Sequence, residues 1–480
     1  MKICARLRPS FTIFIVAMIS RRKFLDTSLG AATAALVCPQ FANAAARPAL
    51  KLATFRFDVS PPKGHPLCGG WIKPVVGMDD SLEAIGLLIT GAGRPIVICA
   101  LDWTGLLNDA HRQWRQALAK AAGTTPDRVA VHCVHQHNAP FVCLEVERIV
   151  SAEGDLPHVV FTDFFQQCLD RGAHAVAAAK KDLRPLTHLA TGQAKVEKVA
   201  SNRRTLGPDG KVVAADWRGS SSKNPRHWEL PEGLIDPWLK TVALYDGETK
   251  VAACHYYACH PMSYYGDGRV SSDFAGLARK RRQAEEQGCT HIYFNGCGGN
   301  IAAGKYNNGT PEARRELTDR MYAGIVASEQ NLQPQHIERV AWQTRKVLLS
   351  PRRTFTEEGL LAQVRKKENA LADRIRPAMM LSFLRRCARK EPIILSALHV
   401  NQTTMLHLPA ECFVEYQLQA QAMAPHRFVA TAAYGDGGPW YIPTEEAYPQ
   451  GGYEVTVAFS EPTTDSILSK ASRALLAASA

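Results

Sequence analysis

The chain has 480 residues, of which 46% are hydrophobic and 21% charged, and its formal net charge is +12 at pH 7. This is an ordinary globular composition without low-complexity tracts or obvious repeats, so disordered and repeat architectures are excluded. The length allows one large catalytic domain or two to three average domains.

The first 44 residues have the features of an export signal. Arg21 and Arg22 precede a short, weakly apolar run that ends in Ala-Asn-Ala at 42–44. This layout predicts a twin-arginine (Tat-type) signal peptide at 1–44 and a periplasmic or secreted mature domain at 45–480. A membrane anchor is the alternative, but the run is too short and too weakly apolar to span a bilayer. Met18 is an alternative start codon.

Strand-like and helix-like segments alternate along the mature chain. Predicted strands lie at 94–102, 128–137, 241–246, 250–261, 290–300, 394–411 and 427–436. Predicted helices lie at 107–123, 159–182, 271–288, 310–330 and from about residue 463. This alternation favours an α/β fold with a mixed β-sheet core flanked by helices. No Pro- or Ser-rich linker divides the chain, so we expect a single large catalytic domain.

Much of the positive charge lies in one segment. Residues 1–44 carry six basic residues and one acidic residue, so their removal leaves a net charge of +7. Residues 351–390 alone carry eleven Lys/Arg and four Asp/Glu. This basic, partly amphipathic helical segment, expected to break near Pro377, is a candidate for peripheral contact with a membrane surface or a polyanion. We favour the alternative of a solvated helical face whose Leu and Met side chains pack inward. No other feature suggests nucleic-acid binding.

The cysteines do not suggest a disulfide framework. Of thirteen, Cys4 and Cys38 lie in the predicted signal peptide, and the other eleven are scattered without a Cys-x-x-Cys pair. We therefore expect buried free thiols and no cysteine zinc site.

The stretch "VHCVHQHNAPF", residues 131–141, contains the first candidate site. On a strand, alternation places His135 and His137 on one face, about 7 Å apart. The turn at 138–140 would place both imidazoles at the mouth of a site. Such a pair either forms half of a metal site or is a histidine-rich strand end that only packs.

Other polar residues also follow predicted strands. His260 ends an apolar strand before Pro261, and Glu411 follows a strand and Pro409. A Gly-rich aromatic loop at 432–454 includes Tyr441, Tyr448 and Tyr453, and the Gly loop at 293–309 presents backbone N–H groups suited to an anion. Each feature alone has an ordinary structural explanation, since a strand-end Glu is usually solvated or capping. Their spacing does not show that they meet.

Taken in order, these segments resemble those of the neutral/alkaline non-lysosomal ceramidase family over nearly all of residues 50–460. The family's His-Thr-His-Ser-Gly-Pro segment is similar to His135-Gln-His137-Asn-Ala-Pro140, and its Asn-Arg-Ser-Pro and His-Pro segments to Asn202-Arg203 and His260-Pro261. Its late acidic segment resembles "LPAE", which ends at Glu411. The most specific match is "YIPTEEAY", starting at Tyr441, with Tyr453 twelve residues after its first tyrosine.

The resemblance implies a zinc-dependent hydrolase that cleaves an amide of an N-acyl, possibly lipid, substrate. It implies a single Zn²⁺ ion held by His135, His260, Glu411 and Tyr441, a nitrogen and oxygen ligand set that zinc accepts. It also implies that His137, Arg203 and Tyr453 face the scissile amide, where they would move a proton or donate to a developing oxyanion.

Two departures from the family pattern matter. The family's Gly-Asp-Val-Ser-Pro turn is similar to Gly299-Asn300-Ile301-Ala302-Ala303, so a serine and an acid of the family are replaced by Ala302 and Asn300. If zinc-activated water is the nucleophile, this loss is tolerable. The family's C-terminal sandwich domain is also expected to be missing. The alternatives are a zinc hydrolase acting on another small amide or ester, and a zinc-retaining inactive binding protein.

Overall fold

Three mixed β-sheets form the core of the protein in a computed structural model that describes residues 49–477. The first sheet has the order β6-β4-β3-β1-β8, with β1 Lys51–Asp58, β3 Glu83–Thr90, β4 Ile96–Leu101, β6 Val129–Cys133 and β8 Arg184–Pro185. The second has the order β14-β12-β11-β9-β16, with β9 His188–Lys195, β11 Trp238–Asp246, β12 Thr249–Tyr257, β14 Thr290–Asn295 and β16 Gln335–His336. The third has the order β17-β18-β19-β21, with β17 Val340–Val347, β18 Ile393–Val400, β19 Thr403–His407 and β21 Phe428–Ala432. The predicted signal peptide at 1–44 lies outside the described residues.

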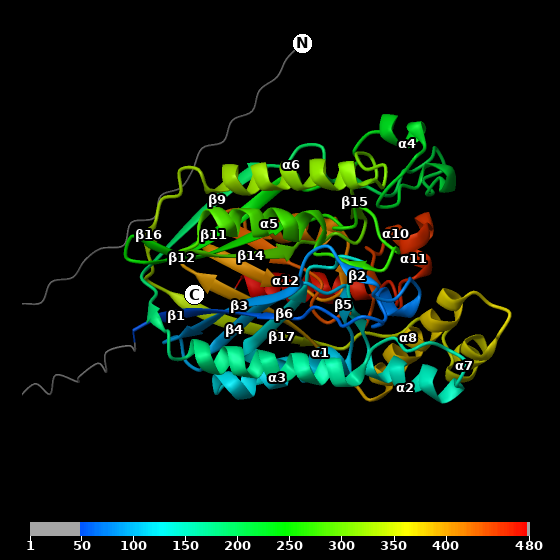
Figure 1. Cartoon of the computed structure of the whole chain (residues 1–480). Coiled ribbons are helices and arrows are strands. Elements are labelled where there is room, and N and C mark those ends of the chain that lie inside the picture. The colour runs from blue at the N-terminus through cyan, green and yellow to red at the C-terminus, as the bar shows by residue number, and fades with distance from the viewer. Residues whose placement is uncertain (1–48, 478–480) are drawn as a thin grey trace, which may run out of the picture. The chain divides into compact units, whose positions relative to one another are not determined.

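Helices cover the outer faces of these sheets (Figure 1). Against the first sheet pack α1 Asp109–Ala122 and α3 Thr162–Ala179, and against the second pack α5 Asp273–Glu285 and α6 Pro311–Glu329. The third sheet contacts α12 Thr464–Leu476 and, through β21, α9 Val414–Met423. The inner faces meet in one apolar cluster to which all three sheets contribute, for example through Ile98, Cys254 and Met405. The predicted α/β class is confirmed, but the core has three mixed sheets where one was expected.

The short elements complete the chain. The two-stranded ladders are β2 Gly77–Met78 with β13 Arg269–Val270, β5 Gly105–Leu106 with β7 Phe141–Val142, β10 Ser201–Asn202 with β15 Ile301–Ala302, and β20 Glu411–Cys412 with β22 Tyr441–Ile442. The remaining helices are α2 Leu144–Glu153, α4 Pro225–Glu229, α7 Glu357–Arg365, α8 Leu371–Ala388, α10 Ala447–Gln450 and α11 Tyr453–Thr456, with 3₁₀ turns η1 Cys68–Gly70, η2 Pro126–Arg128 and η3 Ala214–Asp216. None of the helices within residues 49–477 is both long and apolar enough to cross a membrane.

Each sheet contains one parallel strand pair joined by a helix. These pairs are β4–β6 joined through α1, β12–β14 joined through α5, and β19–β21 joined through α9. A parallel pair requires such a crossover, and ligands of open α/β sheets bind beyond the carboxyl ends of the parallel strands. The fold therefore has three parallel strand pairs whose carboxyl ends could each contribute to a ligand-binding site.

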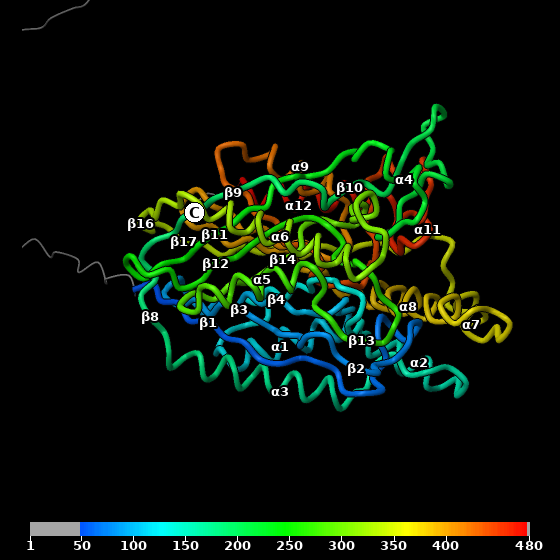
Figure 2. The backbone as a smooth tube through the Cα atoms, turned by 45° about the horizontal axis from the view of Figure 1, so that its top comes forward, coloured from blue at the N-terminus to red at the C-terminus, as the bar shows by residue number. Residues whose placement is uncertain are grey.

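The basic segment at 351–390 folds as two helices, α7 and α8, at the end of the molecule where α2 and α11 also lie (Figures 1 and 2). The predicted break at Pro377 is wrong, because α8 continues through it and the interruption lies at 366–370. Loss of one helical hydrogen bond is outweighed because Ile375, Met379 and Phe383 of this helix are buried in the core. Met379 and Leu381 therefore pack inward, as in the interpretation that we favoured, whereas Leu371 at the start of the helix is exposed.

The eleven cysteines from Cys68 to Cys412 are free thiols, and ten of them are buried. Burial raises the pKa of the Cys168 and Cys289 thiols to about 12, because the thiolate loses hydration in an apolar environment. These side chains behave as small apolar core residues.

Candidate active site

A cavity of about 450 Å³ lies where the three parallel strand pairs end. It is lined by all seven residues that the sequence singled out: His135, His137, Arg203, His260, Glu411, Tyr441 and Tyr453. The structure thus brings together residues that span more than 300 positions of the chain.

His135 and His137 reach the cavity in a different way from the one predicted. Strand β6 ends at Cys133, and His135 has a left-handed backbone with φ of 78°. The His135 N–H donates to the Trp103 carbonyl at 2.9 Å, which holds this turn against the strand end. The expected strand alternation is therefore wrong, although the two rings still lie together, with their centroids 4.9 Å apart.

The other candidate ligands come from the remaining two sheets. His260 follows β12, and its backbone N–H donates to the Ile301 carbonyl at 3.0 Å. Glu411 and Tyr441 begin β20 and β22 and are direct neighbours in this parallel ladder. β20 follows β19 along the chain and β22 follows β21, so segments that follow the third sheet supply both oxygen ligands.

Two imidazole nitrogens and one carboxylate oxygen converge in this cavity. The Nε2 atoms of His135 and His260 are 3.1 Å apart, and Glu411 Oε2 lies 3.3 and 3.2 Å from them. His135 Nδ1 donates to the Thr104 carbonyl and His260 Nδ1 to the Gly298 carbonyl, each at 2.7 Å. These bonds place the proton on Nδ1 of each neutral ring, so both Nε2 atoms present lone pairs.

Three electron pairs that meet without a proton repel one another unless a cation lies between them. Glu411 Oε2 is buried and has no hydrogen-bond partner among residues 49–477. The Tyr441 hydroxyl lies 3.3 Å from His260 Nε2 and adds a second oxygen. Histidines whose Nδ1 atoms are held by carbonyls, together with a carboxylate, form a donor set that fits Zn²⁺.

His137 offers an alternative third nitrogen. One of its ring nitrogens lies within 4.8 Å of those of His135 and His260. We favour Glu411 as the third ligand because its oxygen is closer to both nitrogens and carries a negative charge. His137 Nδ1 is buried and lacks a hydrogen-bond partner in the described part of the chain. This nitrogen is therefore available for a proton or for substrate.

Burial and neighbouring charges set the protonation states. Burial lowers the pKa of His137 and His260, which keeps both imidazoles neutral. Burial raises the pKa of the Tyr441 hydroxyl well above its ordinary range. His137 and His260 are thus neutral, which is the form in which an imidazole binds a metal.

Arg203 lies at the cavity wall and is fixed there by a hydrogen bond, an ion pair and two aromatic rings. It donates to the Tyr441 hydroxyl at 3.0 Å, and its Nε lies 3.3 Å from Glu454 Oε1. Its guanidinium also lies over the rings of Trp217 and Tyr453, at 4.8 and 5.4 Å from their centroids. Burial disfavours the charged form, but the surrounding phenols and Glu454 raise the pKa of Arg203 above its ordinary value. It therefore remains a fixed cation.

Glu454 is a residue that sequence reasoning missed. It is fully buried, accepts from Trp217 Nε1 at 2.9 Å, and pairs with both Arg203 and Arg204 at 3.3 Å. The only signal in the sequence is its position directly after Tyr453, which by itself indicates nothing. Its contacts show that it holds Arg203 in place.

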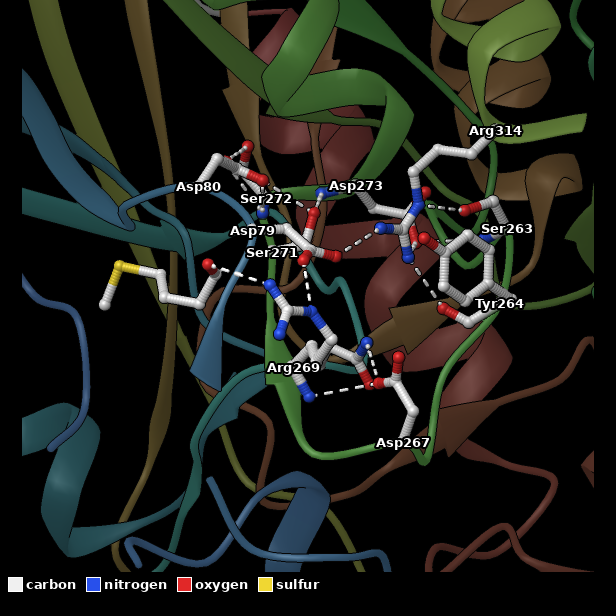
Figure 3. Close-up of polar contacts among 12 residues, drawn as sticks. Asp79, Asp80, Ser263, Tyr264, Asp267, Arg269, Ser271, Ser272, Asp273 and Arg314 are labelled. Carbon is white, nitrogen blue, oxygen red and sulfur yellow. Dashed lines mark hydrogen bonds and ion pairs between the residues drawn. The ribbon is translucent and has the colours of Figure 1, made fainter. Parts of the chain in front are cut away.

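A polar network anchors the loop at the rim of the cavity (Figure 3). Arg314 of α6 donates to Ser263 Oγ at 2.7 Å and to the Tyr264 carbonyl at 2.9 Å, and it lies 3.7 Å from Asp273. The neighbouring side chains of Met262 and Tyr265 line the cavity. The network therefore fixes a rim that sequence reasoning also missed.

The two positions that depart from the family pattern have structural contacts. Asn300 Oδ1 accepts from the Val414 N–H at 2.8 Å, and its Nδ2 donates to Glu415 at 2.9 Å. Ala302 is fully buried in β15, where its carbonyl accepts from Ser201 Oγ. Neither residue lines the cavity.

A second histidine cluster lies within the second sheet. His255 Nε2 is 2.9 Å from His291 Nδ1, and Glu329 lies nearby. Lys250 and Arg282 already pair with this carboxylate at 2.7 and 2.6 Å. The Glu329 carboxylate is therefore already neutralised by two cations, and we interpret the cluster as an ion-pair network.

Comparisons with known proteins identify the fold. No protein-family model and no curated protein matches the chain. A solved structure described as a ceramidase complexed with C2 matches with a TM-score of 0.65 and 16% identity, covering 89% of this chain and 75% of that one. The neutral ceramidase from Pseudomonas aeruginosa matches with a TM-score of 0.64 and 17% identity, covering 89% of this chain and 74% of that one. The resemblance noted from the sequence is thus confirmed at the level of the fold, which this protein shares with neutral ceramidase.

Proposed function

We propose that this protein is an exported, zinc-dependent amidohydrolase that cleaves N-acyl substrates. The observation that carries the proposal is the convergence of the His135, His260 and Glu411 electron pairs at one point of a neutral ceramidase fold. Both structural neighbours are ceramidases, which supports an N-acyl lipid or a related amide as the substrate class.

His135, His260, Glu411 and Tyr441 would hold the metal. A Zn²⁺ ion bound there would supply Lewis acidity, which activates water and polarises an acyl carbonyl. The backbone carbonyls of Thr104 and Gly298 orient the two imidazoles through their Nδ1 atoms. Such outer contacts keep ligands in their binding rotamers.

Three side chains would act on the substrate. His137 would carry a proton between water and the leaving amine through a ring nitrogen, since its Nδ1 has no partner within residues 49–477. Tyr453, whose ring lies 5.8 Å from that of Tyr441, would donate its hydroxyl hydrogen to the carbonyl oxygen as negative charge develops. Arg203 supplies a fixed positive charge beside both phenols.

The proposal is tested by metal analysis and kinetics on purified protein. We expect about one zinc per chain, lost in His135→Ala and in His260→Ala. Tyr453→Phe should retain zinc but lower kcat on an N-acyl amide by about 10²–10³, the usual effect of losing one oxyanion donor. Tyr448→Phe is the matched control. The Tyr448 hydroxyl donates to the Ser460 carbonyl at 2.8 Å, and Tyr448 does not line the cavity.

Each result has a distinct consequence. Full zinc content in both histidine variants would contradict the ligand assignment. Hydrolysis of esters without amides would indicate a different hydrolase at the same site. Zinc binding without turnover of any N-acyl amide or ester would indicate an inactive binding protein.

A further inference from the structure

A second arginine, Arg376 of α8, also lines the cavity. Its guanidinium lies 5.8 Å from the centre of the Trp440 ring, and that ring stacks near Tyr441 with centroids 6.5 Å apart. Arg376 is therefore one aromatic ring away from the candidate metal ligands. Its charge and that of Arg203 also oppose the rise that burial causes in the pKa of Tyr453.

Arg376 differs from its neighbours because its charge is poorly matched. Its nearest carboxylate is Asp373, at 3.6 Å and itself 59% exposed, and its Nε is buried without a hydrogen-bond partner in the described structure. By contrast, Arg374 pairs with Asp155 at 2.9 Å and Arg386 with Asp436 at 2.6 Å. An exposed pair such as that with Asp373 contributes little, so the cation remains available to a ligand.

The cavity has an excess of positive charge once a metal is present. Glu411 offsets only part of the charge of a divalent ion, and Glu454 offsets Arg203. Arg376 then remains without a buried counter-ion on the cavity wall. Charge of one sign inside a low-dielectric cleft attracts ligands of the opposite sign.

Two further features show how such a ligand would be held. Ser220 lines the cavity with its hydroxyl buried and without a hydrogen-bond partner among the described residues. Trp71 and Trp440 stack at 5.8 Å between centroids, and Phe141 packs against both. The cavity therefore combines an aromatic wall for an acyl chain with polar groups for a charged head.

We propose that the preferred substrates are N-acyl compounds whose amine half carries an anionic group, as in an N-acyl amino acid, and that Arg376 determines this specificity. The inference rests on the proposed amide hydrolysis. Water would cleave the acyl C–N bond, releasing a fatty acid and an anionic amine while Arg376 holds the carboxylate of the latter. Neutral N-acyl amino alcohols would leave the Arg376 guanidinium without a partner.

The test compares N-hexanoylglycine with its neutral counterpart N-hexanoylethanolamine on the zinc-loaded full chain. We expect kcat/KM to favour the glycine conjugate by about 10- to 100-fold, as for one charge-assisted hydrogen bond. Arg376→Gln should abolish that preference mainly through KM, and Arg376→Lys should restore part of it. Arg385→Gln is the matched control on the same helix. The Arg385 side chain pairs with Glu357 at 2.6 Å, and it does not line the cavity. N-hexanoyltaurine carries a sulfonate in place of the carboxylate. Its hydrolysis at a similar kcat/KM would indicate a site for any anion, and a much lower kcat/KM would indicate a site specific for a carboxylate.

The two proposals fail separately. Equal hydrolysis of both amides, or an unchanged preference in Arg376→Gln, would overturn the role of Arg376 while amide hydrolysis stands. If no amide is cleaved, the proposed amide hydrolysis is refuted. The role of Arg376 is then tested by calorimetric measurement of the binding of the same two compounds. Tighter binding of N-hexanoylglycine that is lost in Arg376→Gln then supports the anionic site, and equal binding refutes it.

Discussion

Replacement of Glu454 by Gln would remove the counter-charge of two buried arginines while keeping the shape of the side chain. At 3.3 Å and an effective dielectric constant of about 20, each ion pair with Arg203 and Arg204 contributes about 5 kcal/mol of gross attraction. The cost of desolvating the charges offsets much of this attraction in the native protein. In Glu454→Gln the arginines remain buried and only the attraction is lost. We therefore expect the free energy of unfolding to fall by about 3–5 kcal/mol.

The assay is urea-induced unfolding followed by tryptophan fluorescence with saturating zinc. Glu312→Gln is the matched control, because its pair with Arg315 on α6 is exposed, with side chains 65% and 68% accessible. Loss of such a surface pair costs less than about 1 kcal/mol. The Arg204→Met background should reduce the cost of Glu454→Gln, because one stranded charge is then absent. An effect of Glu454→Gln no larger than that of Glu312→Gln would refute the reasoning.

Three other changes have defined outcomes. Ala302→Ser should leave kcat within about twofold, since the side chain does not line the cavity, and a large gain would instead indicate a serine nucleophile. Burial lowers the pKa of His65 from 6.5 to about 4, so the unfolded chain binds this proton more tightly than the folded protein does. The contribution of His65 to the free energy of unfolding is therefore fully present above pH 6.5 and falls by about 2–3 kcal/mol by pH 4.5. Urea titrations at pH 7.5 and 4.5 should show a smaller difference in His65→Gln, and an unchanged difference would exclude this contribution. Changing Arg21 and Arg22 to Lys should leave the protein in the cytoplasm in a fractionation assay, whereas normal export would indicate the general secretory route.

The sequence predicted the class of fold because helix and strand periodicities are local. The helix expected at 107–123 corresponds to α1, and the strands expected at 241–246 and 250–261 correspond to β11 and β12. The division into three sheets could not be predicted, since pairing joins distant segments, as in β1 with β8. The break at Pro377 was wrong because burial of α8, a tertiary effect, outweighs the local preference of proline.

The candidate site was predicted where motifs carry it. His260 and Glu411 lie at predicted strand ends beside Pro261 and Pro409, and His135 lies on a predicted strand, but only the resemblance to the ceramidase family grouped them into one site. The left-handed backbone of His135 was missed because no local signal distinguishes it from a continuing strand. Glu454 and Arg376 were missed because their roles depend only on which side chains they meet in three dimensions.

The origin of the four candidate ligands has a consequence for the assembly of the protein. His135 follows the first sheet, His260 the second, and Glu411 and Tyr441 the third. A bound ion would therefore cross-link three separately connected βαβ units, as a staple closes loops of more than 100 residues. A chain in which any one sheet has not docked lacks at least one ligand. Metal uptake would thus report completed folding, and metal removal should loosen the contacts between the sheets before it affects the sheets themselves.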